Sequence, residues 1–374
     1  MYSQQELDDA VASGVITADA ANALRAYIEN QRTTAIPDEE QFRLVTGFND
    51  IFVSIAAAIL LFAVGWIGQS IGQSTGLYIN DHGETGPSFL APLAIAATSW
   101  GLALFFTARR RMALPSILLL LAFVGGVLLT SAFALVEIIG PDRLNGQDQL
   151  LAATIGGISA AIAAAAAWLH WRRFQVPITV AAGAAAVSGI FLAAVIGIVQ
   201  PGDGESAKNL ILGFVLLLGI GMFLFAMWWD SSDRARLTRR SDVAFWLHLL
   251  AAPMIAHPIF TLLGLNRGTV NIGQALVVVG LYVLFGLTAL AIDRRALLVS
   301  ALAYVLYALT ELFKQFGAVE LNVALTALII GSALLLLSAY WHQARRLIVT
   351  RLPSNLQARL PNLDRTVVIS QQAA

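Results

Sequence analysis

The feature that most constrains this chain is a series of long apolar segments, each about as long as a membrane is thick. A helix of roughly 20 apolar residues crosses the ~30 Å hydrocarbon core of a bilayer. Ten such segments follow residue 50. They run near 51–72, 88–108, 113–137, 150–170, 176–199, 209–229, 243–264, 272–292, 296–316 and 320–341. The sequence therefore predicts an all-α, polytopic membrane protein with about ten transmembrane helices.

Composition excludes the main soluble classes of protein. Hydrophobic residues make up 58% of the chain and charged residues only 12%, whereas a soluble globular chain carries roughly 25% charged residues. A soluble enzyme, a nucleic-acid-binding protein and a disordered chain are all excluded on this basis. The absence of cysteine excludes thiolate metal sites and cysteine catalysis. No phosphate-binding, metal-binding or dinucleotide motif is present, so we expect no cofactor and no metal site.

The placement of the basic residues predicts the orientation of the chain. Arginine and lysine concentrate in short cytoplasmic loops of membrane proteins, and most of the 23 basic residues here lie at the two ends and in alternate loops. The arginines of these turns are Arg110, Arg111, Arg172, Arg173, Arg239, Arg240, Arg294 and Arg295. With an even number of spans, this pattern places both termini in the cytoplasm.

The second to ninth segments form four hairpins with a period of about 60 residues, which suggests a two-helix repeat. The alternative is that any tight cytoplasmic turn selects arginine and proline without duplication. The small residues of segments 150–170 and 176–199 predict close helix packing at the centre of the bundle. Segment 243–264 contains Pro253 and Pro258, so we expect a kink there.

The first fifty residues differ from the rest. Ser13-Gly14 is typical of a helix end, and Thr17 is a good cap for a second helix. Residues 1–50 carry nine acidic and three basic groups, so we expect this segment to fold back onto the basic turns. The predicted domains are a cytoplasmic helical hairpin at 1–35, an interfacial lead-in helix at 36–50, a transmembrane domain at 51–342 and an arginine-containing cytoplasmic tail at 343–374.

The stretch from Leu7 to Ile28, with Ser13-Gly14-Val15-Ile16-Thr17, precedes a proline-led linker and many apolar segments. In this it resembles a group of bacterial predicted membrane proteins with a domain of unknown function. Those proteins have a short helical N-terminal domain before a polytopic membrane domain. The resemblance implies a location in the bacterial cytoplasmic (inner) membrane. It implies no activity, so it transfers no functional residues.

Four polar residues within the apolar segments are candidates for function, because an ionisable group in a membrane is costly. Glu311 and Lys314 lie three residues apart on one helical face. They could form a gate or a site for a charged substrate, or they could be a structural ion pair whose lysine extends to the membrane surface. Glu137 could join Lys314 or lie in the outer interface. His257 precedes Pro258 and could relay protons, or it could be a hydrogen-bonded buried histidine.

Two classes of function remain open from the sequence, and neither is enzymatic. The first is a transporter for a weakly polar or lipid-like solute, since the segments offer few charges for binding ions. The second is a membrane scaffold or regulator in which residues 1–35 recruit a cytoplasmic protein. An intramembrane enzyme, pairing Ser188 with His257, is a third and much weaker hypothesis. The expected partners are the lipid bilayer and that cytoplasmic protein, not nucleic acid.

Overall fold

A computed structural model describes most of the chain in two compact units. One unit comprises residues 1–42 with 364–374, and the other comprises residues 43–363. The described residues are 11–24, 48–81, 84–145, 148–199, 204–234, 236, 238–264, 272–315 and 322–363. For residues 81, 145, 296, 311–315, 322 and 323 the description covers the backbone alone.

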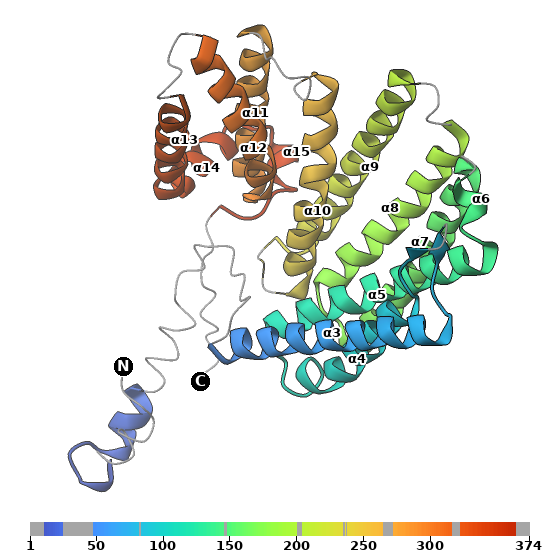
Figure 1. Ribbon diagram of the computed structural model, residues 1–374. Helices are drawn as coiled ribbons and strands as arrows, with labels where there is room; N and C mark the ends of the chain where they lie inside the picture. Colours follow the sequence, from blue (N-terminus) through green and yellow to red (C-terminus); the bar gives the residue numbers. More distant parts are fainter. Residues whose placement is uncertain are drawn as a thin grey trace. The chain divides into compact units, whose positions relative to one another are not determined.

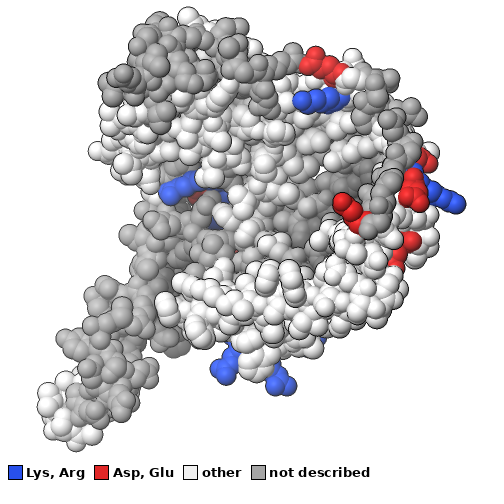
Figure 2. Space-filling view, viewed as in Figure 1, with Lys and Arg blue, Asp and Glu red and all other residues white. Residues whose placement is uncertain are grey.

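The larger unit is built from apolar helices (Figure 1). Within the described residues, seven of them are long and apolar enough to cross a membrane. These are α3 (Phe48–Thr75), α5 (Ala113–Ile139), α7 (Gln149–Phe174), α8 (Ile178–Val199), α9 (Glu205–Ser231), α10 (Arg239–Leu262) and α11 (Ile272–Ile292). The chain is therefore a multi-pass helical membrane protein. On the face seen in Figure 2, the described atoms are mainly uncharged.

The remaining predicted spans are also helical but less regular. Helix α13 (Asn322–Ala339) is followed by α14 (Trp341–Val349) with a bend of 75°, and the pair would make an eighth span if counted together. Helix α4 (Leu90–Phe106) has 17 residues, and α12 (Ala296–Gln315) has a shorter apolar part, Leu297–Thr310. A helix thus occupies each of the ten predicted segments, while the number of membrane crossings stays a prediction.

Consecutive helices pack as hairpins, as the sequence pattern predicts. Helix α4 packs on α5, α7 on α8, α9 on α10 and α11 on α12. Among the described residues, every non-glycine residue with positive φ lies in the four turns between these pairs. They are Arg111, Gln175, Arg236 and Asp293, with φ of 53°, 53°, 55° and 58°. These residues hold different positions relative to the arginines of each turn, so the turns share chemistry without matching residue for residue.

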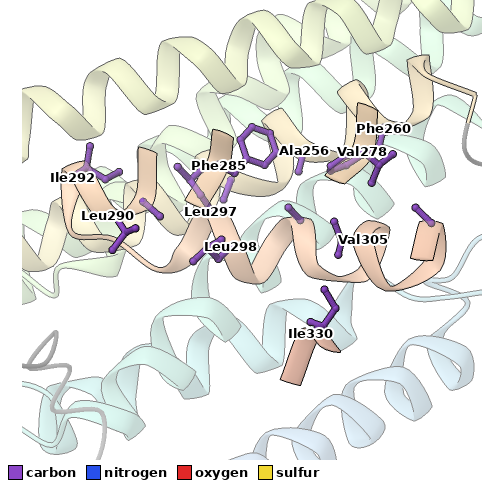
Figure 3. Packing of buried hydrophobic residues seen from close by; sticks show 14 of the residues in the cluster. Ala256, Phe260, Val278, Phe285, Leu290, Ile292, Leu297, Leu298, Val305 and Ile330 are labelled. Carbon is purple, nitrogen blue, oxygen red and sulfur yellow. The ribbon is translucent and has the colours of Figure 1, made fainter. Parts of the chain in front are cut away.

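Helix α10 is the most enclosed of the seven long helices, and it contacts α8, α9 and α12. Its buried residues include Ala252, Ala256 and Phe260. Figure 3 shows side chains of α10, α11 and α12 pointing toward one another, with Ile330 of α13 beside them. The apolar core of this half of the molecule therefore lies between these helices.

The prediction that segments 150–170 and 176–199 both lie at the centre is wrong for the second segment, whose helix α8 is the least enclosed of the seven long helices. The corresponding α7 and α8 do pack closely: a Cβ built on Gly189 of α8 would lie 3.4 Å from the Cβ of Ala160. However, α8 buries only Ile178, Thr179 and Ala181. Small residues allow one close helix contact, but they do not determine whether the other faces of the helix are covered.

Both prolines of segment 243–264 lie inside the single helix α10. A proline at position 258 removes the N–H that would bond to the carbonyl of Met254. Gly219 of α9 packs against this point, where an added Cβ would lie 2.8 Å from both the carbonyl carbon and oxygen of Met254. The freed carbonyl is thus covered by the backbone of a neighbouring helix.

Short elements complete the larger unit. Strands β1 (Asn80–Asp81) and β2 (Glu84–Thr85) form an antiparallel pair between α3 and α4. The side chain of Gln69 holds this loop, donating to the carbonyl of Gly86 at 3.0 Å and accepting from the N–H of Ser88 at 2.8 Å. Helices α6 (Asp142–Asn145) and α15 (Ser354–Gln357) are single turns.

In the smaller unit, only residues 11–24 are described. Gly14 has a φ of +73°, and Thr17 Oγ1 accepts a hydrogen bond from the N–H of Ala20 at 3.2 Å. The predicted helix end and helix cap are therefore confirmed. The rest of the predicted 1–35 hairpin and residues 36–47 of the lead-in helix lie outside the described residues, whereas residues 48–50 belong to α3. The predicted docking of this segment stays a prediction.

Candidate functional site

The most concentrated group of buried charge in the described chain lies where the end of α9, the start of α10, the α11–α12 turn and α14 meet. Five residues form it, and we refer to them as the charged cluster: Asp230, Arg236, Asp293, Arg294 and Arg345. We call this part of the molecule the basic end. It carries the α9–α10 turn, the α11–α12 turn and α14.

Asp230 and Arg294 form the centre of the charged cluster. Asp230 lies in the last turn of α9 and is fully buried, and Arg294 is 3% exposed. Arg294 Nη2 lies 2.7 Å from Asp230 Oδ1 and also donates to the carbonyl of Ser241 at 3.0 Å. This single guanidinium group therefore connects α9, the start of α10 and the α11–α12 turn.

Backbone geometry at the end of α11 places Arg294. Asp293 adopts the left-handed conformation, the N–H of Arg294 bonds to the carbonyl of Ala289 at 2.9 Å, and the N–H of Asp293 bonds to that of Leu290 at 3.4 Å. This is the Schellman arrangement, in which glycine is the usual residue. The left-handed conformation is strained for a residue other than glycine. It places the carboxylate of Asp293 among the arginines of the charged cluster.

Arg236 links the two aspartates. Its Nη1 lies 2.9 Å from Asp293 Oδ2, and its Nη2 lies 3.6 Å from Asp230 Oδ2. Nη2 also donates to the carbonyls of Ile292 and Asp293, at 3.0 and 3.2 Å. The α9–α10 turn is thus bound to the end of α11 by both charge and backbone hydrogen bonds.

Helix α14 joins the charged cluster through Trp341 and Arg345. Trp341 Nε1 donates to Asp293 Oδ1 at 2.7 Å, and Arg345 Nε lies 3.8 Å from the same oxygen. Arg345 also donates to the carbonyls of Pro361 and Asn362, at 2.7 and 3.2 Å. The guanidinium of Arg345 therefore connects the charged cluster to the chain that follows α14.

We name residues 350–363 the C-terminal segment, and a second arginine holds it. Arg234, in the α9–α10 turn, donates from Nε to the carbonyl of Leu360 at 2.9 Å and from Nη2 to that of Gln357 at 3.3 Å. The N–H of Asn362 returns a bond to the carbonyl of Arg234 at 3.3 Å. The sequence predicts a cytoplasmic tail at 343–374. In the structure, the part of this tail up to Leu363 packs within the larger unit.

The burial of charge follows a clear distribution. Among the described residues, the charged residues that are buried are Asp50, Asp230, Asp233, Arg294 and Arg345. All of these except Asp50 lie at the basic end. Asp233 Oδ2 accepts from both the N–H and the hydroxyl of Thr238, at 2.9 and 2.7 Å, which fixes the start of α10. Buried charge in this part of the chain therefore orders helix ends and the C-terminal segment.

The sequence-predicted polar candidates lie apart from the charged cluster. His257 Nδ1 is 2.5 Å from the hydroxyl of Tyr304, a hydrogen bond that joins α10 to α12. Glu137 is partly buried, and its Oε2 has no hydrogen-bond partner among the described residues. Glu311 and Lys314 lie on the backbone of α12, but their side chains are outside the description. Whether these two residues meet Glu137 stays a prediction.

The predicted basic turns differ in their surroundings. Arg110, Arg111, Arg172, Arg173, Arg239 and Arg240 are exposed. Arg294 is buried in the charged cluster, and Arg295 is partly buried with its guanidinium 4.8 Å from the ring centre of Trp341. Sequence reasoning did not separate these two residues from the other turn arginines. The available signal was Asp230, an acidic residue at the start of a basic turn.

The described residues hold no group of three side chains suited to bind a metal ion. No protein-family model matches the chain, and no curated protein or solved structure matches it at a significant level. The resemblance of the N-terminal segment therefore stays a prediction.

Proposed function

We propose that this protein is a membrane scaffold with a fixed cytoplasmic surface, from which the acidic N-terminal segment recruits a cytoplasmic protein. The observation that supports the proposal is the charged cluster. It joins the ends of four helices and the C-terminal segment at one end of the membrane domain.

The energetics of buried ion pairs favour a fixed surface. Removing one partner of a buried pair costs ~3–5 kcal/mol, because the other charge is left without compensation. A movement that separated α9 from the α11–α12 turn would break the pair between Asp230 and Arg294 and the pair between Arg236 and Asp293 together. We therefore assign the charged cluster to holding one arrangement of helix ends.

The orientation of the chain is part of the proposal. The positive-inside pattern favours a cytoplasmic basic end and cytoplasmic termini, in the inner membrane of a bacterium. The first fifty residues have a net charge of −6, from nine acidic and three basic groups. The recruited partner is accordingly a cytoplasmic protein with a basic surface, since complementary charge steers association.

A photo-reactive residue at Val15, which is 77% exposed, tests this proposal in the full-length protein in native membranes. We expect one predominant cytoplasmic protein to crosslink to position 15. Crosslinking should fall when the acidic residues of segment 1–35 are changed to their amides. A photo-reactive residue at Leu335, which is 74% exposed on α13, is the control and should crosslink to lipid. Crosslinking of position 15 to nothing but the protein's own basic turns would contradict the scaffold.

Transport of a weakly polar or lipid-like solute is the competing function. It depends on the Glu311 and Lys314 pair that the sequence places on α12. In proteoliposomes, a transporter would move a fluorescent phospholipid between leaflets, and Glu311→Gln would abolish that movement. Movement by the wild type together with its loss in this variant would favour the transporter over the scaffold.

A further inference from the structure

A cavity lies beside the charged cluster, between α11, α12, α13 and the start of α14. Its volume is about 140 Å³, and its apolar lining consists of Leu298, Val299, Leu302, Leu334 and Leu337. Its polar lining consists of Tyr282, Arg295, Ser338 and the indole of Trp341. The cavity is thus apolar along its length, with a positive charge on one side.

Arg295 differs from its neighbour Arg294 in having unused hydrogen-bonding capacity. Arg294 bonds to Asp230 and to the carbonyl of Ser241. Among the described residues, the guanidinium group of Arg295 makes no hydrogen bond and no ion pair, and it lies against the face of the Trp341 ring. Such a contact holds a guanidinium group through its flat face. The N–H groups at the edge of Arg295 are therefore left to bind an anion.

Tyr282 also lines the cavity, and its hydroxyl group lacks a partner within the described chain. The hydroxyl of Tyr282 is shielded from solvent and, within the described chain, makes no hydrogen bond. Buried hydroxyl groups are normally hydrogen-bonded. An oxygen acceptor on an occupant could satisfy this group only after a small shift of the Tyr282 side chain, so the proposal depends on Arg295.

The position of the cavity indicates an occupant from the bilayer. Trp341 stands at the 75° bend where the chain turns out of α13 into α14, and tryptophan favours the headgroup level of a membrane. The outer surface beside the cavity carries exposed apolar side chains, with Val299 65% and Leu335 74% exposed. In a membrane protein such side chains face lipid, so an acyl chain reaches the cavity by lateral diffusion.

The size of the cavity supports the same conclusion. Pockets that enclose a soluble small molecule measure roughly 300–1,000 Å³, which is well above the volume found here. A phospholipid needs to place only its phosphate and the first part of one chain in the cavity, because the bilayer holds the rest. Basic sites between transmembrane helices at the cytoplasmic side commonly hold anionic lipid headgroups.

We propose that this cavity binds an anionic phospholipid, with the phosphate on Arg295 and Ser338 and one acyl chain along Leu302 and Leu334. The planar guanidinium group suits a phosphate because it donates two parallel hydrogen bonds. Arg295 adjoins Arg294, and Trp341 donates to Asp293, so the bound lipid lies against the residues that hold the charged cluster.

Native mass spectrometry of the full-length protein, with phosphatidylglycerol or phosphatidylcholine added, tests the site. The wild type should retain phosphatidylglycerol preferentially. Arg295→Gln should reduce that preference about fivefold, the effect of one arginine worth ~1 kcal/mol near an anionic membrane. The control Arg240→Gln changes an exposed arginine of α10 and should leave the preference unchanged.

A second variant tests the apolar part of the site independently of charge. Leu334→Trp fills the cavity and should displace the lipid while Arg295 is intact. Equal loss of preference in Arg295→Gln and Arg240→Gln would overturn the site, because it would show general surface charge. Unchanged lipid retention in both Arg295→Gln and Leu334→Trp would also overturn it, as would full displacement of phosphatidylglycerol by inorganic phosphate.

Discussion

At the scale of single residues, Asp230 has the largest expected effect. Its carboxylate is fully buried and is an ion-pair partner of both Arg294 and Arg236. The amide of Asp230→Asn would leave two guanidinium groups without their common counter-charge.

We expect Asp230→Asn to lower the stability of the folded protein by ~3–5 kcal/mol, the usual effect of breaking a buried pair. Denaturant unfolding in detergent measures this change. Asp142→Asn is the matched control, because Asp142 is exposed in α6, and it should unfold like the wild type. A stability loss of the same size in both variants would show that the effect is not due to the charged cluster.

A smaller residue-scale effect is expected at the bond between His257 and Tyr304. Tyr304→Phe removes the hydroxyl that lies 2.5 Å from His257 Nδ1, which should cost about 1 kcal/mol. The melting temperature should fall slightly while the protein stays folded. Tyr340→Phe, at an exposed position, serves as the control. Equal melting temperatures for Tyr304→Phe and the wild type would show that this hydrogen bond does not stabilise the contact of α10 with α12.

Residue-level sequence reasoning succeeded where the cause is local. The left-handed Gly14 and the cap at Thr17 follow from interactions within four residues. The burial of Arg294 was not predicted. Two consecutive arginines in a turn look alike in the sequence, whether they face water or pair with a carboxylate 64 residues earlier in the chain. The burial of Arg294 depends on the long-range packing of α9 against the α11–α12 turn.

At the scale of elements, the contact of α9 with α10 depends on one glycine. A Cβ at Gly219 would lie 2.8 Å from the backbone of Met254, whereas a Cβ at Gly221 would meet nothing within 4 Å. Backbone cannot yield as a flexible side chain can, so the two glycines should respond oppositely to substitution.

We expect Gly219→Ala to weaken the α9–α10 contact and lower the melting temperature. Gly221→Ala should leave it unchanged or raise it slightly, because alanine is the better helix former by ~1 kcal/mol. Thermal unfolding of both variants in one detergent gives the comparison. A stable Gly219→Ala variant would mean that the two helices are not held at this distance.

The elements themselves were largely predictable, because long apolar runs can form little except helices in a membrane. The break between α13 and α14 was not anticipated. The run near 320–341 ends at Trp341, where the following helix turns by 75° and brings Arg345 to Asp293. This turn is determined by tertiary contacts that hydropathy does not encode.

At the scale of the whole molecule, the placement of charge predicts the topology. The chain has no cysteine, so a single introduced cysteine is a unique label. Cysteine at Arg173 or Arg240 should react with a membrane-impermeant maleimide only after the cells are permeabilised. Cysteine at Asp142, in the short helix α6 that the charge pattern predicts on the opposite side, should react in intact spheroplasts. Labelling of position 240 in intact spheroplasts would contradict a cytoplasmic basic end.

The central claim for the whole molecule is that buried charge fixes the C-terminal segment against the basic end of the membrane domain. Hydrogen–deuterium exchange of the full-length protein in lipid nanodiscs measures this most directly, at the backbone amides of residues 350–363. Loss of the charged cluster by Asp230→Asn should speed exchange there at least about tenfold, equivalent to ~1.4 kcal/mol of local stability, while Asp142→Asn leaves it slow. Equal exchange in the wild type and Asp230→Asn would contradict the claim.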